Sequence, residues 1–161
     1  MKSIKTIVLA LLLALCPAAP VTHAEPFEDN PDAAARDPDY AAGKAAMDKK
    51  NWPEAVKRFN QAALRAPDSA DLQNYLGFSY RNLKQMDLAF KHYKRSIELN
   101  PRHRGAHEYI GEAYLMTNDL ASAEKHLAAL RSICLLPCEE LADLEKAVAA
   151  YRTRQKQTAK P

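Results

Sequence analysis

Small and apolar side chains recur along most of this chain with a period of 34 residues. The spacing joins six sets of positions: Gly43, Gly77 and Gly111; Ala55, Ala89 and Ala123; Phe59, Tyr93 and Leu127; Ala42, Leu76 and Ile110; Ala46, Tyr80 and Tyr114; and Trp52, Met86 and Leu120. A repeat of this length is typical of stacked supersecondary units. The pattern therefore predicts three consecutive units, over about 36–69, 70–103 and 104–137.

Each unit is expected to be a pair of helices. In the second helix an alanine precedes a large residue by four positions, as Ala89 precedes Tyr93, so that both lie on one helix face. In the first helix a glycine such as Gly77 lets the partner helix approach closely. Pro67 and Pro101 follow the second helices, and proline ends a helix because it lacks an N–H donor and clashes with the preceding turn.

A further amphipathic segment follows the third unit. Its apolar face holds Leu141, Leu144, Val148 and Tyr151. Stacked helix pairs leave an apolar end exposed unless a final helix covers it. We therefore expect a capping helix over 138–153. The chain is predicted to be an all-α solenoid of three helix-turn-helix units plus this cap, a domain over 38–153, with a disordered tail over 154–161.

These registers resemble the tetratricopeptide-repeat (TPR) family. The middle unit is the most similar, with family residues at Leu76, Gly77, Tyr80, Ala89, Tyr93 and Pro101. The first unit departs at Ala42 and Ala46, where bulkier groups are usual, and the third has Leu135 in place of a final proline. The stretches "DPDYAAGKAAMDKKNWPEAV" and "HRGAHEYIGEAYL" also resemble a group of small exported bacterial TPR proteins. The resemblance implies a right-handed superhelical stack whose first helices line a concave groove suited to a peptide.

The N-terminus has the features of a secretory signal peptide. Two lysines precede an uncharged apolar run over residues 6–15, and a small-residue cleavage site ends at Ala24. The run is too short to cross a bilayer as a helix. We expect residues 1–24 to be removed and the protein to be exported, most readily to the periplasm. Cys16 leaves a lipid-anchored form open, although Leu15 stands where a small residue normally precedes such a cysteine.

Composition limits the classes of partner. After residues 1–24, an acidic, proline-punctuated stretch over 25–37 is expected to be a flexible leader. The 137 residues beyond the signal hold 21 Lys and Arg against 20 Asp and Glu, so the net charge is near +1. This balance gives no electrostatic basis for binding nucleic acid or an anionic membrane, and no later segment is apolar enough to span one. No catalytic constellation or cofactor motif is present, so we predict a protein that is not an enzyme.

Two cysteines, Cys134 and Cys138, lie four positions apart after the third unit. On an unbroken helix this spacing keeps β-carbons about 5–6 Å apart, too far for a disulfide, but Pro137 interrupts the helix. Exported proteins form disulfides, so we predict one here that fixes the docking angle of the cap. A redox or metal-handling role with His103 and His107 remains an alternative, although a Cys-x-x-Cys motif and further ligands are missing.

The family arrangement implies which residues line the groove. They are Tyr40, Lys44 and Met47 in the first unit, Asn74, Tyr75, Phe78 and Arg81 in the second, and Glu108, Tyr109, Glu112 and Leu115 in the third. Phe78 lies outside the packing registers and is expected to be a contact anchor. Of the positions where chaperone-binding relatives hold a carboxylate, only Lys44 has a suitable side chain, so that clamp is not predicted.

The predicted function is that of a non-catalytic scaffold in the periplasm that binds another protein or a peptide segment through the groove. Two alternatives remain. One is the redox or metal chemistry of the two cysteines. The other is self-association, in which copies of the solenoid stack end to end.

Overall fold

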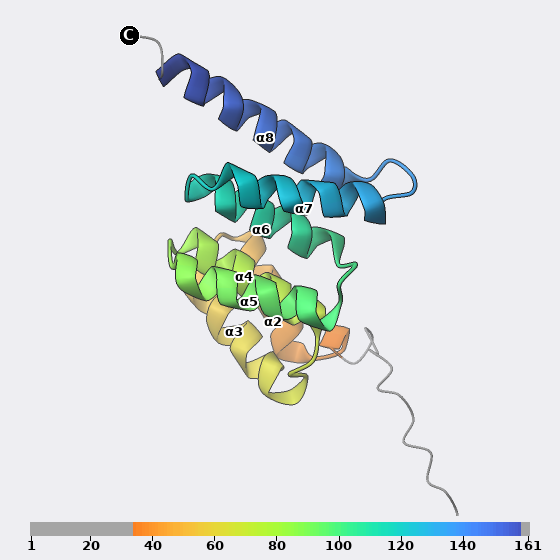
Figure 1. Cartoon of the computed structure of the whole chain (residues 1–161). Coiled ribbons are helices and arrows are strands. Elements are labelled where there is room, and N and C mark those ends of the chain that lie inside the picture. Colours follow the sequence, from red (N-terminus) through yellow and green to blue (C-terminus); the bar gives the residue numbers. More distant parts are fainter. Residues whose placement is uncertain (1–33, 159–161) are drawn as a thin grey trace, which may run out of the picture.

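Seven α-helices follow one another along residues 34–158, the part of the chain that the computed structural model describes (Figure 1). They are α2 (Pro38–Asp48), α3 (Trp52–Arg65), α4 (Ala70–Asn82), α5 (Met86–Leu99), α6 (Arg104–Met116), α7 (Leu120–Ile133) and α8 (Glu139–Thr158). Within these residues there is no strand, and consecutive helices form antiparallel pairs that stack side by side. The predicted all-α solenoid is confirmed. The predicted signal peptide and most of the leader lie outside the described residues.

Side-chain caps set where most of these helices begin. Five capping side chains each accept a hydrogen bond from a backbone N–H in the first turn of the helix that follows: Asp37, Asn51, Ser69, His103 and Asp119. Such caps satisfy donors that the helix itself leaves unpaired. The turn inside each unit passes through the left-handed backbone region, with φ of 55° at Lys50, 62° at Lys84 and 63° at Asn118. These three residues are again 34 positions apart, so the repeat extends to the turns.

The glycines allow the paired helices to come close, as predicted. A β-carbon on Gly43 would lie 2.6 Å from Cδ1 of Phe59, and one on Gly77 would lie 2.5 Å from Cδ1 of Tyr93. Both aromatic rings are fully buried. Because van der Waals contacts between carbons lie near 3.5–4.0 Å, a side chain at either glycine would push the two helices of that unit apart.

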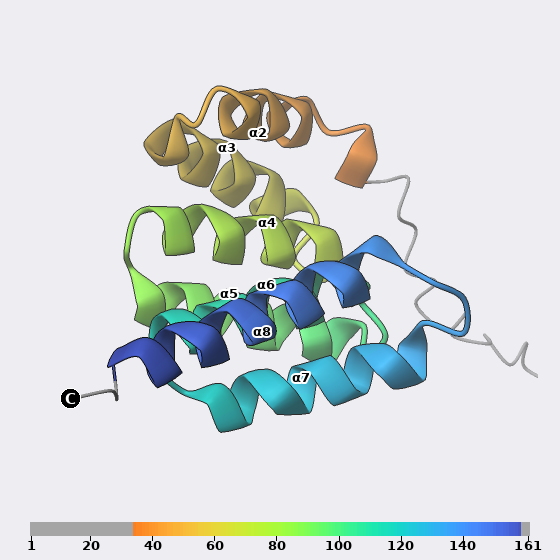
Figure 2. The same ribbon diagram turned by 90° about the horizontal axis from the view of Figure 1, so that it is seen from above.

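The final helix does more than cover the end of the stack. α8 packs against both α6 and α7 (Figures 1 and 2). Leu144 lies 34 residues after Ile110 and is likewise fully buried. It also occupies the space beside Gly111, where a β-carbon would lie 2.7 Å from Cδ2 of Leu144. α8 therefore takes the position of the first helix of a fourth unit.

Two boundaries differ from those expected. α8 continues to Thr158, so residues 154–158 are helical although we expected them in the tail; they contain good helix formers and neither glycine nor proline. Asp37, expected in the leader, caps α2 and accepts hydrogen bonds from Arg65 at 2.6 and 2.8 Å. This ion pair ties the start of α2 to the end of α3.

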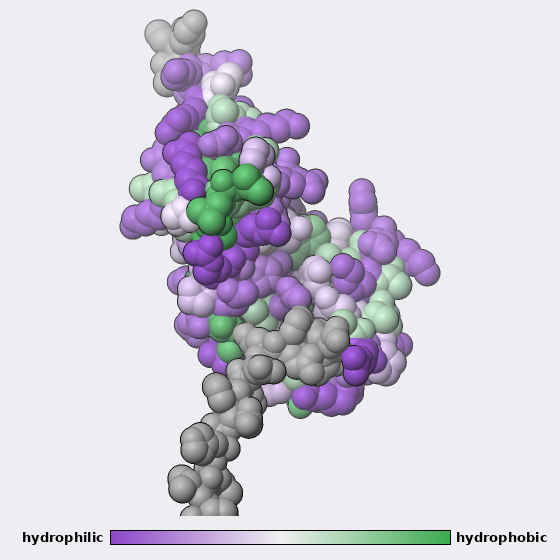
Figure 3. Space-filling model, turned by 90° about the vertical axis from the view of Figure 1, so that its right-hand side faces the viewer, coloured by the Kyte–Doolittle hydropathy of each residue, from purple (hydrophilic) through white to green (hydrophobic). Residues whose placement is uncertain are grey.

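The loop between α7 and α8 contains the two cysteines. Their Sγ atoms lie 2.09 Å apart. Leu135 and Leu136, between them, are 87% and 79% exposed. Figure 3 shows a hydrophobic patch toward the α7–α8 end of a largely hydrophilic face. No helix among residues 34–158 is both long and apolar enough to cross a membrane.

Candidate peptide-binding groove

Two cavities lie on the face formed by α4, α6 and α8. The first, of about 330 Å³, is at the N-terminal ends of these helices and is lined by Asp71, Asn74, Tyr75, His103, Gly105, Glu108, Tyr109, Glu139, Glu140 and Asp143. The second, of about 340 Å³, is at their C-terminal ends and is lined by Arg81, Asn82, Lys84, Glu112, Leu115, Met116, Ala147, Ala150 and Arg154. We call them the acidic pocket and the basic pocket.

An aromatic floor lies beside the two pockets. The rings of Phe78 and Tyr109 are 4.9 Å apart between centroids, and Trp52 packs edge-on against Phe78 at 5.7 Å. Phe78 and Tyr109 were both predicted for the groove, and the structure brings them into contact. Trp52 was missed because it begins α3 and follows the same register as the packing residues Met86 and Leu120.

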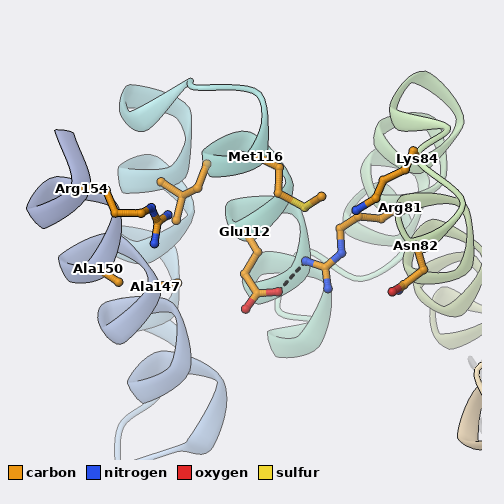
Figure 4. Close-up of a pocket in the computed structure, with 9 residues that line it drawn as sticks. Arg81, Asn82, Lys84, Glu112, Met116, Ala147, Ala150 and Arg154 are labelled. Atoms are coloured by element: carbon orange, nitrogen blue, oxygen red, sulfur yellow. Dashed lines mark hydrogen bonds and ion pairs between the residues drawn. The ribbon is translucent and has the colours of Figure 1, made fainter. Parts of the chain in front are cut away.

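Arg81 and Glu112 pair with each other across α4 and α6. Nη1 of Arg81 lies 2.5 Å from Oε2 of Glu112 (Figure 4). The same atom donates a second hydrogen bond to the carbonyl of Tyr109 at 3.3 Å. The guanidinium also lies 5.0 Å from the ring centroid of Phe78, and Arg81 is only 8% exposed. Its charge is already balanced, which leaves Lys84 and Arg154 as the accessible cations of the basic pocket.

The residues predicted on α2 lie at the other side of α4. Nζ of Lys44 donates to the hydroxyl of Tyr75 at 3.1 Å and lies 4.7 Å from the centroid of its ring. Tyr40 packs edge-on against Tyr75 and Phe59, at 5.8 and 6.2 Å between centroids, and its burial raises the pKa of its hydroxyl. Met47 is half-buried against the same core. Of the three residues predicted on α2, Lys44 is the exposed one.

Leu115, the last residue predicted for the groove, belongs both to the core and to a pocket wall. It is 7% exposed and belongs to the apolar cluster that also holds Leu127, Val148 and Tyr151. It also lines the basic pocket. It follows the phase of Arg81, which lines the same pocket, and its other contacts are with α7 and α8 in the core.

The acidic pocket holds carboxylates in different electrostatic states. Oδ1 of Asp71 lies 2.9 Å from Nε2 of His103, and this hydrogen bond lowers the pKa of Asp71. Glu108 has neither a hydrogen bond nor an ion pair to any of residues 34–158. Burial raises the pKa of Glu108 to about 8, and the nearby carboxylates of Glu112 and Asp143 add to the effect. The pocket therefore combines Asp71, whose charge His103 stabilises, with Glu108, whose raised pKa favours the neutral carboxyl near pH 7.

Asn74 lies at the back of the same pocket. It is 4% exposed, and its Oδ1 has no hydrogen-bond donor within the described part of the chain. A β-carbon on Gly105 would lie 3.2 Å from Nδ2 of Asn74, so the glycine leaves the space beside the amide open. Buried side-chain amides are almost always paired, which makes this one unusual.

The histidines considered for metal binding have separate partners. His103 caps α6 by accepting from the N–H of Ala106 at 3.1 Å, besides its contact with Asp71. Nδ1 of His107 lies 3.0 Å from Nδ1 of His126. Among residues 34–158, no group of three or more His, Cys, Asp or Glu side chains is arranged to hold a metal ion.

Comparison with known proteins decides the family. The tetratricopeptide-repeat family matches residues 40–101 and 87–133, together more than half of the chain. The chain belongs to the tetratricopeptide-repeat family. No curated protein matches it.

Solved TPR-like structures share the architecture. The TPR2B domain of yeast Sti1, solved as a complex with pHsp70, matches with a TM-score of 0.67 and 21% identity over 77% of this chain and 97% of that one. The translocator chaperone SycD from Yersinia enterocolitica type III secretion matches at 0.67 and 18%, over 78% and 96%. The CopN–Scc3 complex matches at 0.59 and 21%, over 71% and 66%. At these identities the likeness shows the fold.

Sequence reasoning missed the contribution of α8 to this TPR groove. Glu139, Glu140 and Asp143 line the acidic pocket, and Arg154 lines the basic pocket. We treated α8 only as a cap. The signal was available, because Leu144 continues the register of Leu76 and Ile110 and so places α8 in line with the first helices of the repeats.

Proposed function

We propose that this TPR protein is a non-catalytic scaffold that captures a segment of another protein in the groove formed by its first helices and α8. One observation carries the proposal: two cavities of opposite charge lie at opposite ends of the same helix face, beside an aromatic floor. Aromatic side chains and arginine dominate the energetics of protein interfaces. The pocket walls come from rigid helices, so little ordering would be needed on binding.

The spacing of the pockets suggests the length of the segment. Gly105 and Met116 lie at the two ends of α6 and line the acidic and basic pockets, respectively. A helix rises about 1.5 Å per residue, so these ends are about 16 Å apart. An extended chain spans about 3.3 Å per residue, and about five residues would therefore reach from one pocket to the other.

Similar structures support a protein partner. The TPR2B domain of Sti1 was solved in a complex with pHsp70, CopN–Scc3 is itself a complex, and SycD is a translocator chaperone. By its sequence we further propose that the chain acts after export, in the periplasm, where the Cys134–Cys138 pair would be oxidised. No cofactor is required for this activity.

The test is affinity capture from the exported fraction of the source organism after cross-linking, read by mass spectrometry. Phe78→Ala removes the centre of the aromatic floor. Leu64→Ala, at a residue of α3 that is 76% exposed, is the matched control. Proteins that are captured by wild type and Leu64→Ala, but lost with Phe78→Ala, would support groove binding. Partners that all three forms retain equally would place binding elsewhere on the molecule.

A further inference from the structure

We propose that the acidic pocket binds a cationic side chain of the partner segment, preferably an arginine, and thereby sets the direction in which the segment lies along the groove. The inference rests on the proposed function and adds the chemistry of the partner. Negative charge gathers at one end of the groove, whereas Lys84 and Arg154 lie at the other. A segment would therefore bind with its basic residue against the N-terminal ends of α4, α6 and α8.

Five carboxylates line the acidic pocket, at Asp71, Glu108, Glu139, Glu140 and Asp143. Two of them have a cationic or potentially cationic partner: Asp71 contacts His103 at 2.9 Å, and Glu140 lies 3.4 Å from Arg104. The other three form no ion pair with any residue that the structure describes. A cation that enters the pocket therefore meets the unpaired carboxylates of Glu139 and Asp143, and it would favour ionisation of Glu108, whose raised pKa otherwise favours the neutral carboxyl.

Helix geometry explains only part of this charge. Acidic side chains in the first turn of a helix are stabilised by its dipole, which accounts for Glu139 and Glu140 at the start of α8. The effect fades beyond the first turn. Glu108 and Asp143 are each the fifth residue of their helices, α6 and α8, so the dipole gives them little stabilisation. These two carboxylates need another explanation.

Asn74 is the second, independent observation. Its amide is 4% exposed, lines the acidic pocket and has an oxygen without a donor among residues 34–158. Nδ2 of Asn74 lies on the side of Gly105, which also lines the pocket. A flip of the amide, which exchanges oxygen and nitrogen, would place the oxygen on that side. A guanidinium group carries five N–H donors in a planar fork and could satisfy this oxygen together with a carboxylate.

The shape of the acidic pocket and its aromatic residues favour an arginine side chain over a free cation. Gly105 carries no side chain and leaves room beside the amide of Asn74. Tyr75 and Tyr109 also line the pocket, and each ring already has a cation of the chain near one face, Lys44 at 4.7 Å and Arg81 at 5.4 Å from the centroids. Guanidinium groups stack on such rings and exchange hydration for planar contacts more readily than ammonium groups do. Burial and nearby carboxylates raise the pKa of Glu108, and a cation bound beside it would lower that pKa again.

The experiment uses peptides, because the partner is not identified. An array of random 12-residue peptides is screened with the purified chain, and the strongest binders are synthesised with a fluorescent label. Each arginine is then replaced by citrulline and each lysine by acetyl-lysine, which keep the shape but remove the charge. Affinity is measured by fluorescence anisotropy at low and high salt.

We expect one cationic position in each binder to be essential, with neutral replacement weakening binding about tenfold or more. Glu108→Gln and Asp143→Asn should weaken binding of the arginine peptide by a similar factor and leave the affinity of the citrulline peptide unchanged. Asp87→Asn on α5, an exposed acid away from the groove, is the matched control and should bind like wild type. High salt should reduce the difference between the two peptides.

Two results would overturn parts of the account separately. Suppose that Phe78→Ala weakens peptide binding but the arginine and citrulline peptides bind equally well. The proposed cation-binding role of the acidic pocket would then be wrong, whereas the proposed groove function would be retained. The same holds if binding is unaffected by both Glu108→Gln and Asp143→Asn. If no peptide binds at all, or if binding is indifferent to Phe78→Ala, the proposed groove function fails as well. Thermal melting of each variant shows that it is folded.

Discussion

Substitution of Gly77 by alanine should destabilise the protein, although alanine is the better helix former. The added β-carbon would lie 2.5, 2.6 and 2.9 Å from Cδ1, Cε1 and Cγ of Tyr93. Tyr93 is fully buried. Relief of these contacts requires a movement of about 1 Å by the ring or by the α4–α5 pair.

The magnitude follows from two opposing effects. Overpacking in a closely packed core costs about 1–3 kcal/mol, and contacts with a rigid ring place Gly77→Ala near the upper value. The change from glycine to alanine within a helix returns about 1 kcal/mol. The expected net loss is about 2 kcal/mol, or about 6–10 °C in Tm for a domain of this size.

Urea and thermal unfolding, followed by circular dichroism, measure this loss directly. Gly105→Ala is the matched control: its β-carbon would meet the end of the Asn74 side chain at 3.2 Å, and not a buried ring. That variant should be as stable as wild type or more stable by up to about 1 kcal/mol. If Gly77→Ala melted at or above the wild-type temperature, the reasoning about helix approach would be refuted.

Three further outcomes are expected. Reduction of Cys134 and Cys138, or their replacement by serine, should lower the free energy of unfolding by about 2 kcal/mol, the modest value expected for a short closed loop. If samples of confirmed mass had the same urea midpoint with and without reductant, the bond would be absent or without effect. Burial, aided by His107, lowers the pKa of His126 from 6.5 to about 4. The unfolded chain therefore takes up this proton first, and between pH 6.5 and 4 wild type should lose about 1–2 kcal/mol of stability relative to His126→Gln, allowing for solvent screening at this half-buried ring. Comparison with this variant removes the opposite contribution of Glu108, whose raised pKa stabilises the folded state as the pH falls; urea midpoints that run parallel in the two forms would contradict the prediction. Phe78→Ala should still unfold cooperatively, with a loss of about 1–2 kcal/mol, and a loss above about 4 kcal/mol would assign Phe78 to the core.

The fold could be predicted because equivalent packing positions recur in successive units of the sequence. The first two units repeat the same pairing of a glycine with a large buried residue, Gly43 with Phe59 and Gly77 with Tyr93. Agreement among copies reveals positions that a single unit would leave ambiguous. The third unit differs, because Gly111 packs against Leu144 of α8, although Leu127 follows the register of Phe59 and Tyr93.

The candidate site could be predicted only in part. Phases along the repeat identified the face on which Phe78 and Tyr109 lie, since helix geometry determines which side chains point outward. They could not reveal that Arg81 is held by Glu112, because that contact depends on the rotamers of two long side chains on different helices. Nor did they reveal that the amide oxygen of Asn74 has no hydrogen-bond donor among residues 34–158, because this depends on which groups the neighbouring helices place near it.

Site-specific photo-cross-linking tests the central claim most directly. The photoreactive amino acid p-benzoylphenylalanine is placed at Phe78 in the aromatic floor or at Leu64 on the exposed face of α3, and the chain is irradiated in living cells of the source organism. We predict cross-links to another protein from position 78 and few from position 64, with peptide mapping that places the attachment within about five residues of a basic side chain. Equal cross-linking from both positions, or none from position 78, would contradict the claim that the groove is the binding surface.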